Sequence, residues 1–146
     1  MKELIVFILI WIAMIATSIW ESSSEGRNAW NKHKFGWKLK IKDYILLTRY
    51  HFFLFWIMFP ALLAVPLVLD FSWRLFGIIT SSYISGLVVQ DFGWYIFNPA
   101  VKFKEFFTSF SDYYPWIKIK NKKIIPTGYL IGIIISLLLL YFFVLK

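Results

Sequence analysis

The sequence predicts an all-α membrane protein in which four transmembrane helices are joined by loops with amphipathic interfacial segments. The chain has 146 residues, of which 60% are hydrophobic and 22% aromatic, and few soluble domains are so apolar. Its apolar residues gather into four runs, each near the length of about 20 residues that crosses a bilayer core. Between the runs, basic residues alternate with aromatic ones, which is typical of segments at the headgroup level. We therefore expect a single membrane domain over residues 1–146.

Charge and cysteine content exclude several classes of function. The net charge is +8, from sixteen Lys and Arg against eight Asp and Glu. In a membrane protein such an excess favours contact with anionic lipid headgroups, so we expect membrane lipids as partners and no nucleic acid. Since the chain has no cysteine, disulfides, thiolate metal sites and thiol redox chemistry are excluded.

The first apolar run, residues 4–20, is just long enough to cross a bilayer. A basic start and small residues would also suit a signal peptide, but Trp20 is typical of the interfacial end of a retained helix. Ala13, Thr17 and Glu21 recur every four residues, which predicts a narrow face for close contact with another helix. The basic and aromatic residues of 21–43 predict a segment lying along the membrane surface.

The second and third runs predict an antiparallel pair of helices joined by a tight hairpin. Residues 44–69 form a long second span, in which Pro60 and Pro66 remove backbone donors and favour a kink. Residues 75–98 form the third span, which should end there because Pro99 disfavours helical geometry in the preceding residue.

The residues after the third span predict an in-plane helix and a fourth span. The helix should cover residues 100–110, where four phenylalanines fall at i, i+3, i+4 and i+7: Phe103, Phe106, Phe107 and Phe110. A turn and a second membrane-surface stretch should follow. The fourth span is expected at 127–145, and Gly128, Gly132 and Ser136 give it a second face for close packing.

The distribution of basic residues predicts the orientation. The loops after spans one and three hold twelve of the sixteen Lys and Arg, six in each loop. By the positive-inside rule both loops should be cytoplasmic, with both termini outside the plasma membrane.

Asp91 in the third span is the strongest candidate for a functional residue. An unpaired carboxylate in hydrocarbon costs at least a few kcal/mol, so Asp91 should face protein or water and have a partner. Helix geometry places His51 of the second span at a similar depth, so we expect Arg49 or His51 to pair with Asp91. Arg49 and His51 are about 200° apart around the helix, so they cannot both face one partner.

Several polar residues should meet in this layer, each with a structural alternative. His51 is a candidate general acid or base with Asp91 as its orienting partner, or a packing histidine. Arg49 could instead neutralise Asp91 or reach lipid phosphates. The candidate ligand-binding residues are Glu21, Arg49, Gln90, Trp94, Asn98 and Tyr129. The candidate metal ligands are Glu21, Glu25, His51 and Asp91, although two carboxylates beside serines at a helix end are more often solvated.

A resemblance rests on Gln90-Asp91-Phe92-Gly93-Trp94 followed by Asn98-Pro99, with Tyr50-His51 upstream and Pro115-Trp116 downstream. This layout resembles small prokaryotic four-span membrane proteins of unassigned function. In that family the first position is often Glu and the residue before the later Trp is often His. Gln90 and Pro115 depart from this pattern, which weakens a two-carboxylate or two-histidine metal site. The resemblance implies the architecture and no particular reaction or cofactor.

Three functional hypotheses follow. The first is a polar intramembrane pocket, open toward the cytoplasmic interface, that binds or modifies a lipid-like or isoprenoid-like molecule. The second is a non-enzymatic small subunit or an oligomeric scaffold of a membrane complex, held by its small-residue faces. A channel or transporter is the third, but the outer half has almost no ionisable groups and there is no inverted repeat. The sequence leaves open whether the protein is an enzyme.

Overall fold

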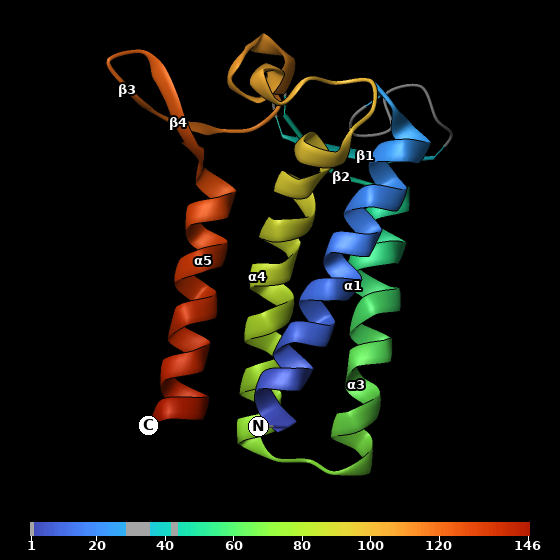
Figure 1. The fold of residues 1–146 in the computed structure, drawn as a ribbon, viewed down its shortest axis with the longest axis vertical. Coiled ribbons are helices and arrows are strands. Elements are labelled where there is room, and N and C mark those ends of the chain that lie inside the picture. The colour runs from blue at the N-terminus through green and yellow to red at the C-terminus, as the bar shows by residue number, and fades with distance from the viewer. Residues whose placement is uncertain (1, 29–35, 42–43) are drawn as a thin grey trace.

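Four long helices form the body of the protein (Figure 1). The computed structural model describes residues 2–28, 36–41 and 44–146. The elements are α1 (Lys2–Glu25), β1 (Lys38–Ile41), β2 (Tyr44–Thr48), α2 (Arg49–His51), the π-helix η2 (Phe52–Met58), α3 (Phe59–Leu69), α4 (Trp73–Phe97), the 3-10 helices η3 (Phe103–Phe107) and η4 (Ser109–Ser111), β3 (Trp116–Ile119), β4 (Lys122–Pro126), α5 (Thr127–Leu140) and the π-helix η5 (Tyr141–Leu145). Among the described residues, four helical stretches are long and apolar enough to cross a membrane: Lys2–Glu25, Arg49–Leu69, Trp73–Phe97 and Thr127–Leu145.

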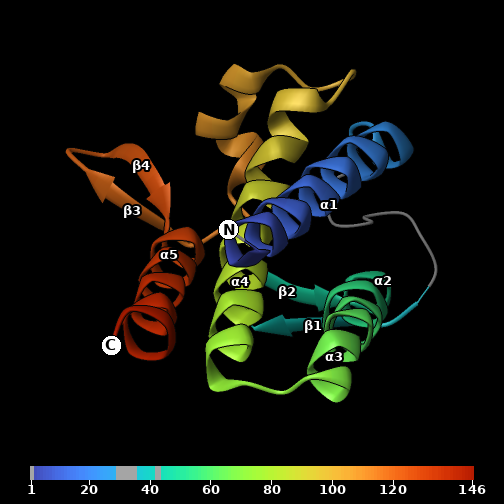
Figure 2. The ribbon, with the colours of Figure 1, turned by 60° about the horizontal axis from the view of Figure 1, so that its bottom comes forward.

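Helix α4 lies at the centre, with α1 and α5 packed against it (Figure 2). Small residues allow the close approach, as predicted. A Cβ at Gly86 would lie 2.8 Å from Met14 Cγ on α1, and one at Gly132 of α5 would lie 3.0 Å from Val88 Cγ2 on α4. Ser136 of α5 also donates a hydrogen bond to the Ser81 carbonyl of α4 at 2.9 Å.

The two ends of the molecule differ in character. Both termini and the connection between α3 and α4 lie at one end, and the two hairpins and the 3-10 helices lie at the other (Figure 1). The two loops that carry most of the basic residues therefore share one end of the helices, which agrees with the predicted arrangement of four spans.

The third and fourth spans begin and end close to the predicted positions. Helix α4 starts at Trp73, where the Ser72 hydroxyl caps it by accepting a hydrogen bond from the Leu75 N–H at 3.1 Å. It ends at Phe97, directly before the Asn98-Pro99 pair, as predicted. The fourth span covers 127–145 as α5 followed by η5.

Helix α1 is longer than predicted. It continues to Glu25 because the hydroxyls of Ser22, Ser23 and Ser24 bond to carbonyls of the preceding helical turn, which satisfies these polar side chains locally. Its buried residues are Ile10, Met14, Ser18, Glu21, Ser22 and Glu25. The predicted contact face was therefore wrong at Ala13, which is exposed.

The second span starts later than predicted. Residues 44–48 are strand β2, paired antiparallel with β1, and the helix begins only at Arg49. Thr48 sets this boundary, since its hydroxyl accepts a hydrogen bond from the His51 N–H at 3.3 Å as an N-cap. Further along, the π-helix η2 ends at Met58, shortly before Pro60, whose missing N–H interrupts the regular hydrogen-bond ladder.

The predicted in-plane α-helix over 100–110 is absent from the described chain. Two 3-10 helices, η3 and η4, take its place. The Asn98 side chain accepts the N–H groups of Ala100 and Val101, and the Thr108 hydroxyl accepts that of Phe110, so local side-chain bonds replace a continuous helix. Phe106 is buried, but Phe103 and Phe107 are 45% and 46% exposed.

The loop after α4 folds back onto the ends of α4 and α5. Phe106 lies in an aromatic core formed by Trp94, Tyr95, Val101, Phe106 and Tyr129. Beyond it, β3 and β4 form a hairpin whose turn residues Lys120 and Asn121 have φ of 47° and 62°.

The predicted surface segment 21–43 is described only in part. Residues 21–25 belong to α1, and the predictions for 29–35 and 42–43 lie outside the described residues.

Candidate functional site

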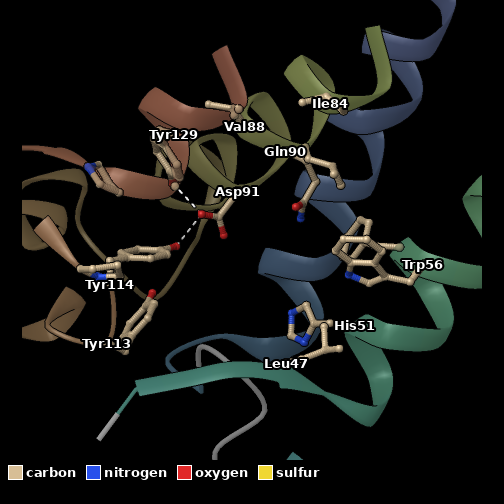
Figure 3. Close-up of a pocket in the computed structure, with 16 residues that line it drawn as sticks. Leu47, His51, Trp56, Ile84, Val88, Gln90, Asp91, Tyr113, Tyr114 and Tyr129 are labelled. Carbon is tan, nitrogen blue, oxygen red and sulfur yellow. Dashed lines mark hydrogen bonds between the residues drawn. The ribbon is translucent and has the colours of Figure 1, made fainter. Parts of the chain in front are cut away.

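A cavity of about 440 Å³ lies between α4, α5 and the start of the second span. Most of its wall is apolar, and Figure 3 shows Trp56, Ile84 and Val88 on this part. The end near the loops is polar, with Gln90, Asp91 and His51 beside three tyrosines: Tyr113, Tyr114 and Tyr129. The cavity therefore has an apolar length and a polar end.

Asp91 is held by two tyrosine hydroxyls. Tyr114 from the loop and Tyr129 from α5 each donate a hydrogen bond to Asp91 Oδ2 at 2.7 Å (Figure 3). Burial raises the pKa of Tyr114 well above its usual value, and the nearby Asp91 charge acts in the same direction. Tyr114 therefore stays protonated and donates. These two bonds come from tyrosines, whereas the sequence-based expectation named Arg49 or His51 as the partner of Asp91.

His51 lies against Glu21. Its Nε2 is 3.3 Å from Glu21 Oε1, and its Nδ1 is 2.6 Å from the Thr48 hydroxyl. Gln90 donates a hydrogen bond to the other oxygen of Glu21. Three helical stretches thus meet at one carboxylate: the acid in contact with the His51 imidazole is Glu21, and Asp91 lines the same cavity as both.

Glu25 joins this group from the next turn of α1. One ligand atom from each of Glu21, Glu25 and His51 lies within 4.8 Å of the other two. Glu21 and Glu25 are only 3% and 5% exposed, which overturns the expectation that they are solvated. They are buried because α1 continues past Trp20 as a helix and carries both side chains inward.

A second, smaller cavity of about 20 Å³ adjoins this group. Its lining residues are Glu21, Glu25, His51, Asp91, Trp94, Tyr113 and Tyr114. Trp94 is 4% exposed, and its indole N–H has no hydrogen-bond partner among the described residues. His51 and Asp91 line both cavities, so the acidic group and the polar end of the large cavity are continuous.

Two of the predicted site residues lie elsewhere. Arg49 is exposed and lines a different cavity with Tyr50 and Phe53, consistent with the expectation that Arg49 and His51 face different sides. Asn98 is structural, because its Nδ2 donates to the Gly26 carbonyl at 2.8 Å and so ties the end of α4 to the end of α1.

Sequence analysis missed the loop tyrosines. Tyr113 and Tyr114 were assigned only to a turn, yet Tyr114 binds Asp91, and the Tyr113 hydroxyl contacts that of Tyr95. Helical periodicity gives no sign of a loop that folds back onto a helix end. The available signal was two hydroxyl-bearing aromatics before Pro115, in a loop that follows the span containing Asp91.

Comparison of the chain with protein-family models, curated proteins and solved structures finds no match. The resemblance to small four-span membrane proteins therefore stays a prediction from the sequence, and the chemistry must be argued from the site itself.

The site combines hydrogen-bond acceptors, donors and a group that can carry a proton. Asp91 is an acceptor whose position is fixed by Tyr114 and Tyr129. The imidazole of His51 is in contact with Glu21, and an imidazole in such a position can act as a general acid or base. Among the described residues, those able to hold a metal are Glu21, Glu25 and His51.

Proposed function

We propose that this protein is a multi-pass membrane protein that binds a lipid-like or isoprenoid-like molecule in the cavity between α4, α5 and η2. The observation that carries the proposal is the change along the cavity from an apolar wall to a polar end. A volume of about 440 Å³ falls within the range of roughly 300–1,000 Å³ typical of small-molecule sites. An amphipathic molecule matches this division, with its chain along the apolar wall and its headgroup at Asp91.

The polar end favours a headgroup that donates hydrogen bonds. Asp91 is an acceptor, and Glu21 adds a second carboxylate nearby, so a hydroxyl or amine suits this end better than a bare phosphate. Anionic headgroups of surrounding lipids would instead meet the lysines of the β3–β4 hairpin, at Lys118, Lys120 and Lys122. If the headgroup is chemically modified, His51 is the residue able to move a proton.

Gly128 provides a test because it lines the cavity and a Cβ built on it would meet no atom within 4 Å. Gly128→Leu should fill the cavity without disturbing helix packing. Native mass spectrometry of wild-type protein released from membranes should show a bound lipid-like adduct, and Gly128→Leu should lose most of it. Ala13→Leu adds similar bulk on an exposed face of α1 and serves as the matched control, which should keep the adduct.

Equal adduct occupancy in wild type, Gly128→Leu and Ala13→Leu would contradict the proposal, because binding would then not depend on the cavity. Wild-type protein with no adduct, and with no saturable uptake of a long-chain alcohol added in detergent, would contradict it as well.

A role as a small subunit of a membrane complex is a second candidate function, and the exposure of α3 favours it. No residue of α3 is buried. Its apolar surface is therefore available to lipid or to another chain, including a second copy of this one. Cross-linking in native membranes through a cysteine at Leu62, which is 61% exposed, should give a defined oligomer if α3 is an interface, and a monomer if it faces lipid.

A further inference from the structure

We propose that Glu21, Glu25 and His51 bind one divalent transition-metal ion beside the polar end of the large cavity. The three side chains come from two segments that are far apart in sequence, α1 and α2, and converge at the loop end of the helices. This inference does not depend on the lipid-binding proposal, because it rests on a different cavity and can be tested without lipid.

The ligand atoms are already close to coordination geometry. One atom from each of the three residues lies within 4.8 Å of the others. An ion with bonds of about 2.0–2.2 Å to nitrogen and oxygen holds its ligands roughly 3–4.4 Å apart. Small side-chain rotations would therefore complete the site. The adjoining cavity of about 20 Å³ has room for one ion or one water.

Neighbouring side chains hold two of the ligands in the required orientation. The Thr48 hydroxyl lies 2.6 Å from His51 Nδ1, so it can fix the imidazole with Nε2 toward Glu21. Gln90 bonds to one oxygen of Glu21, and the other oxygen is directed toward His51. Hydrogen bonds of this kind, made to the far side of the ligating groups, are a regular feature of protein metal sites.

Trp94 supplies an independent observation. Its side chain is buried and lines the small cavity, but its indole N–H has no acceptor among the described residues. A buried donor without an acceptor is destabilising and calls for an explanation. A water molecule bound to the proposed ion would give this N–H an acceptor within the same cavity.

The donor set indicates the type of ion. One imidazole and two carboxylates, with no cysteine in the chain, favour Zn²⁺, Mn²⁺ or Fe²⁺ over soft ions such as Cu⁺. The competing explanation is a proton. Two carboxylates so close together repel each other, and either a shared proton or a cation between them offsets that repulsion. A protonated His51 beside Glu21 would also form a plain ion pair.

Metal binding to the purified full chain separates these explanations. The protein should carry no polyhistidine tag and should have the substitution His33→Asn, which leaves His51 as the sole imidazole of the chain. After chelation, calorimetric titration with Zn²⁺ should give one ion per chain, and Glu21→Gln and Glu25→Gln should each weaken binding at least about tenfold. Glu3→Gln, at the opposite end of α1 and paired with Arg74, is the matched control and should bind as the parent does.

The result for the His33→Asn parent can overturn the inference by itself. Absence of stoichiometric Zn²⁺ and Mn²⁺ binding to the folded parent would leave the proton as the explanation. Binding that is unchanged in both Glu21→Gln and Glu25→Gln would place the ion elsewhere.

Co²⁺ bound to the parent should show an imidazole nitrogen in its X-ray absorption spectrum, and a shell of oxygen alone would exclude His51 as a ligand. Should one variant fail to fold, the other variant and this spectrum decide.

Discussion

Asp91 acts in this structure as the common acceptor of two tyrosine hydroxyls. Tyr114 and Tyr129 both point at Asp91 Oδ2, so the carboxylate joins the loop and α5 to α4. This arrangement sets the polar end of the large cavity and explains how an acid within a helix long enough to cross a membrane can be accommodated. Both of these partners are neutral hydroxyl donors.

Two substitutions of Asp91 should separate its role in stability from its role in ligand binding. Asp91→Leu leaves the hydroxyls of Tyr114 and Tyr129 without this acceptor, so we expect the free energy of unfolding to fall by about 1–3 kcal/mol for each hydroxyl left buried and unpaired. Asp91→Asn keeps an acceptor oxygen and should remain folded, while losing the ligand that the wild type retains. Thermal unfolding in one detergent measures the first effect, and native mass spectrometry measures the second. Equal stability of both variants would show that the two hydroxyls do not depend on Asp91.

A depth argument from the sequence found much of this site. Helix geometry placed His51 and Asp91 in one layer, with Glu21 and Glu25 above it, and all four side chains line one small cavity in the structure. The pairing within that layer could not be predicted, because it depends on helix rotation and on the fold of the loop. Arg49 faces outward, Glu21 takes the place beside His51, and Tyr114 arrives from a segment without helical periodicity.

At the scale of helices, close packing around α4 depends on small residues. A Cβ at Gly77 would lie 2.3 Å from Phe143 Cβ, whereas one at Gly128 would meet nothing within 4 Å. Gly77→Ala should therefore lower the free energy of unfolding by about 1–3 kcal/mol through overpacking. Gly128→Ala is the matched control, and it should be neutral or stabilising by up to about 1 kcal/mol because alanine favours the helix. Unfolding midpoints of the two variants test this, and a smaller loss in Gly77→Ala than in Gly128→Ala would contradict it.

The link between α1 and η3 should depend on pH. Hydrogen bonds from Arg27 and from the Lys102 N–H hold the pKa of Glu105 at about 2, below its ordinary 4.5. A lowered pKa means that the stabilisation is present above pH 4.5 and is lost as the pH falls toward about 2. The effect should be small, since the pair is exposed.

Amide hydrogen exchange in residues 102–107 measures this link, after correction for the intrinsic pH dependence of exchange. Protection there should decrease over that pH interval in the wild type. Glu105→Gln should have low protection throughout and little further change. Protection that is insensitive to pH in both proteins would show that the ion pair does not hold η3 in place.

Apolar runs predicted the helices well and their polar ends poorly. Residues 44–48 are as apolar as a helix start, so hydropathy alone could not distinguish strand β2 from the second span. Conversely, Glu21 to Glu25 look like a loop, but the serine hydroxyls bond to the helix backbone and Glu21 accepts a hydrogen bond from Gln90. Asn98-Pro99 is a local signal that needs no tertiary information, which is why the end of α4 was predicted closely.

At the scale of the whole molecule, the two basic loops lie at the same end of the helices, so both must face the same side of the membrane. With both loops at one end and both termini at the other, the positive-inside rule predicts that the loop end is cytoplasmic (Figure 1). Because the native chain has no cysteine, single cysteines report cleanly. An impermeant thiol reagent applied to intact cells should label a cysteine at Lys146 and spare one at Lys120. Labelling at Lys120 but not at Lys146 would reverse the orientation.

The central claim is that an amphipathic molecule lies in the cavity between α4, α5 and η2. Photolabelling tests it most directly, with a long-chain alcohol that carries a diazirine in its chain and with peptide mapping by mass spectrometry. We predict saturable labels on Ile84, Val88 and Trp56, and their loss in Gly128→Leu but not in Ala13→Leu. Labels spread over exposed positions such as Val68 and Leu69, at the same level in all three proteins, would contradict the claim.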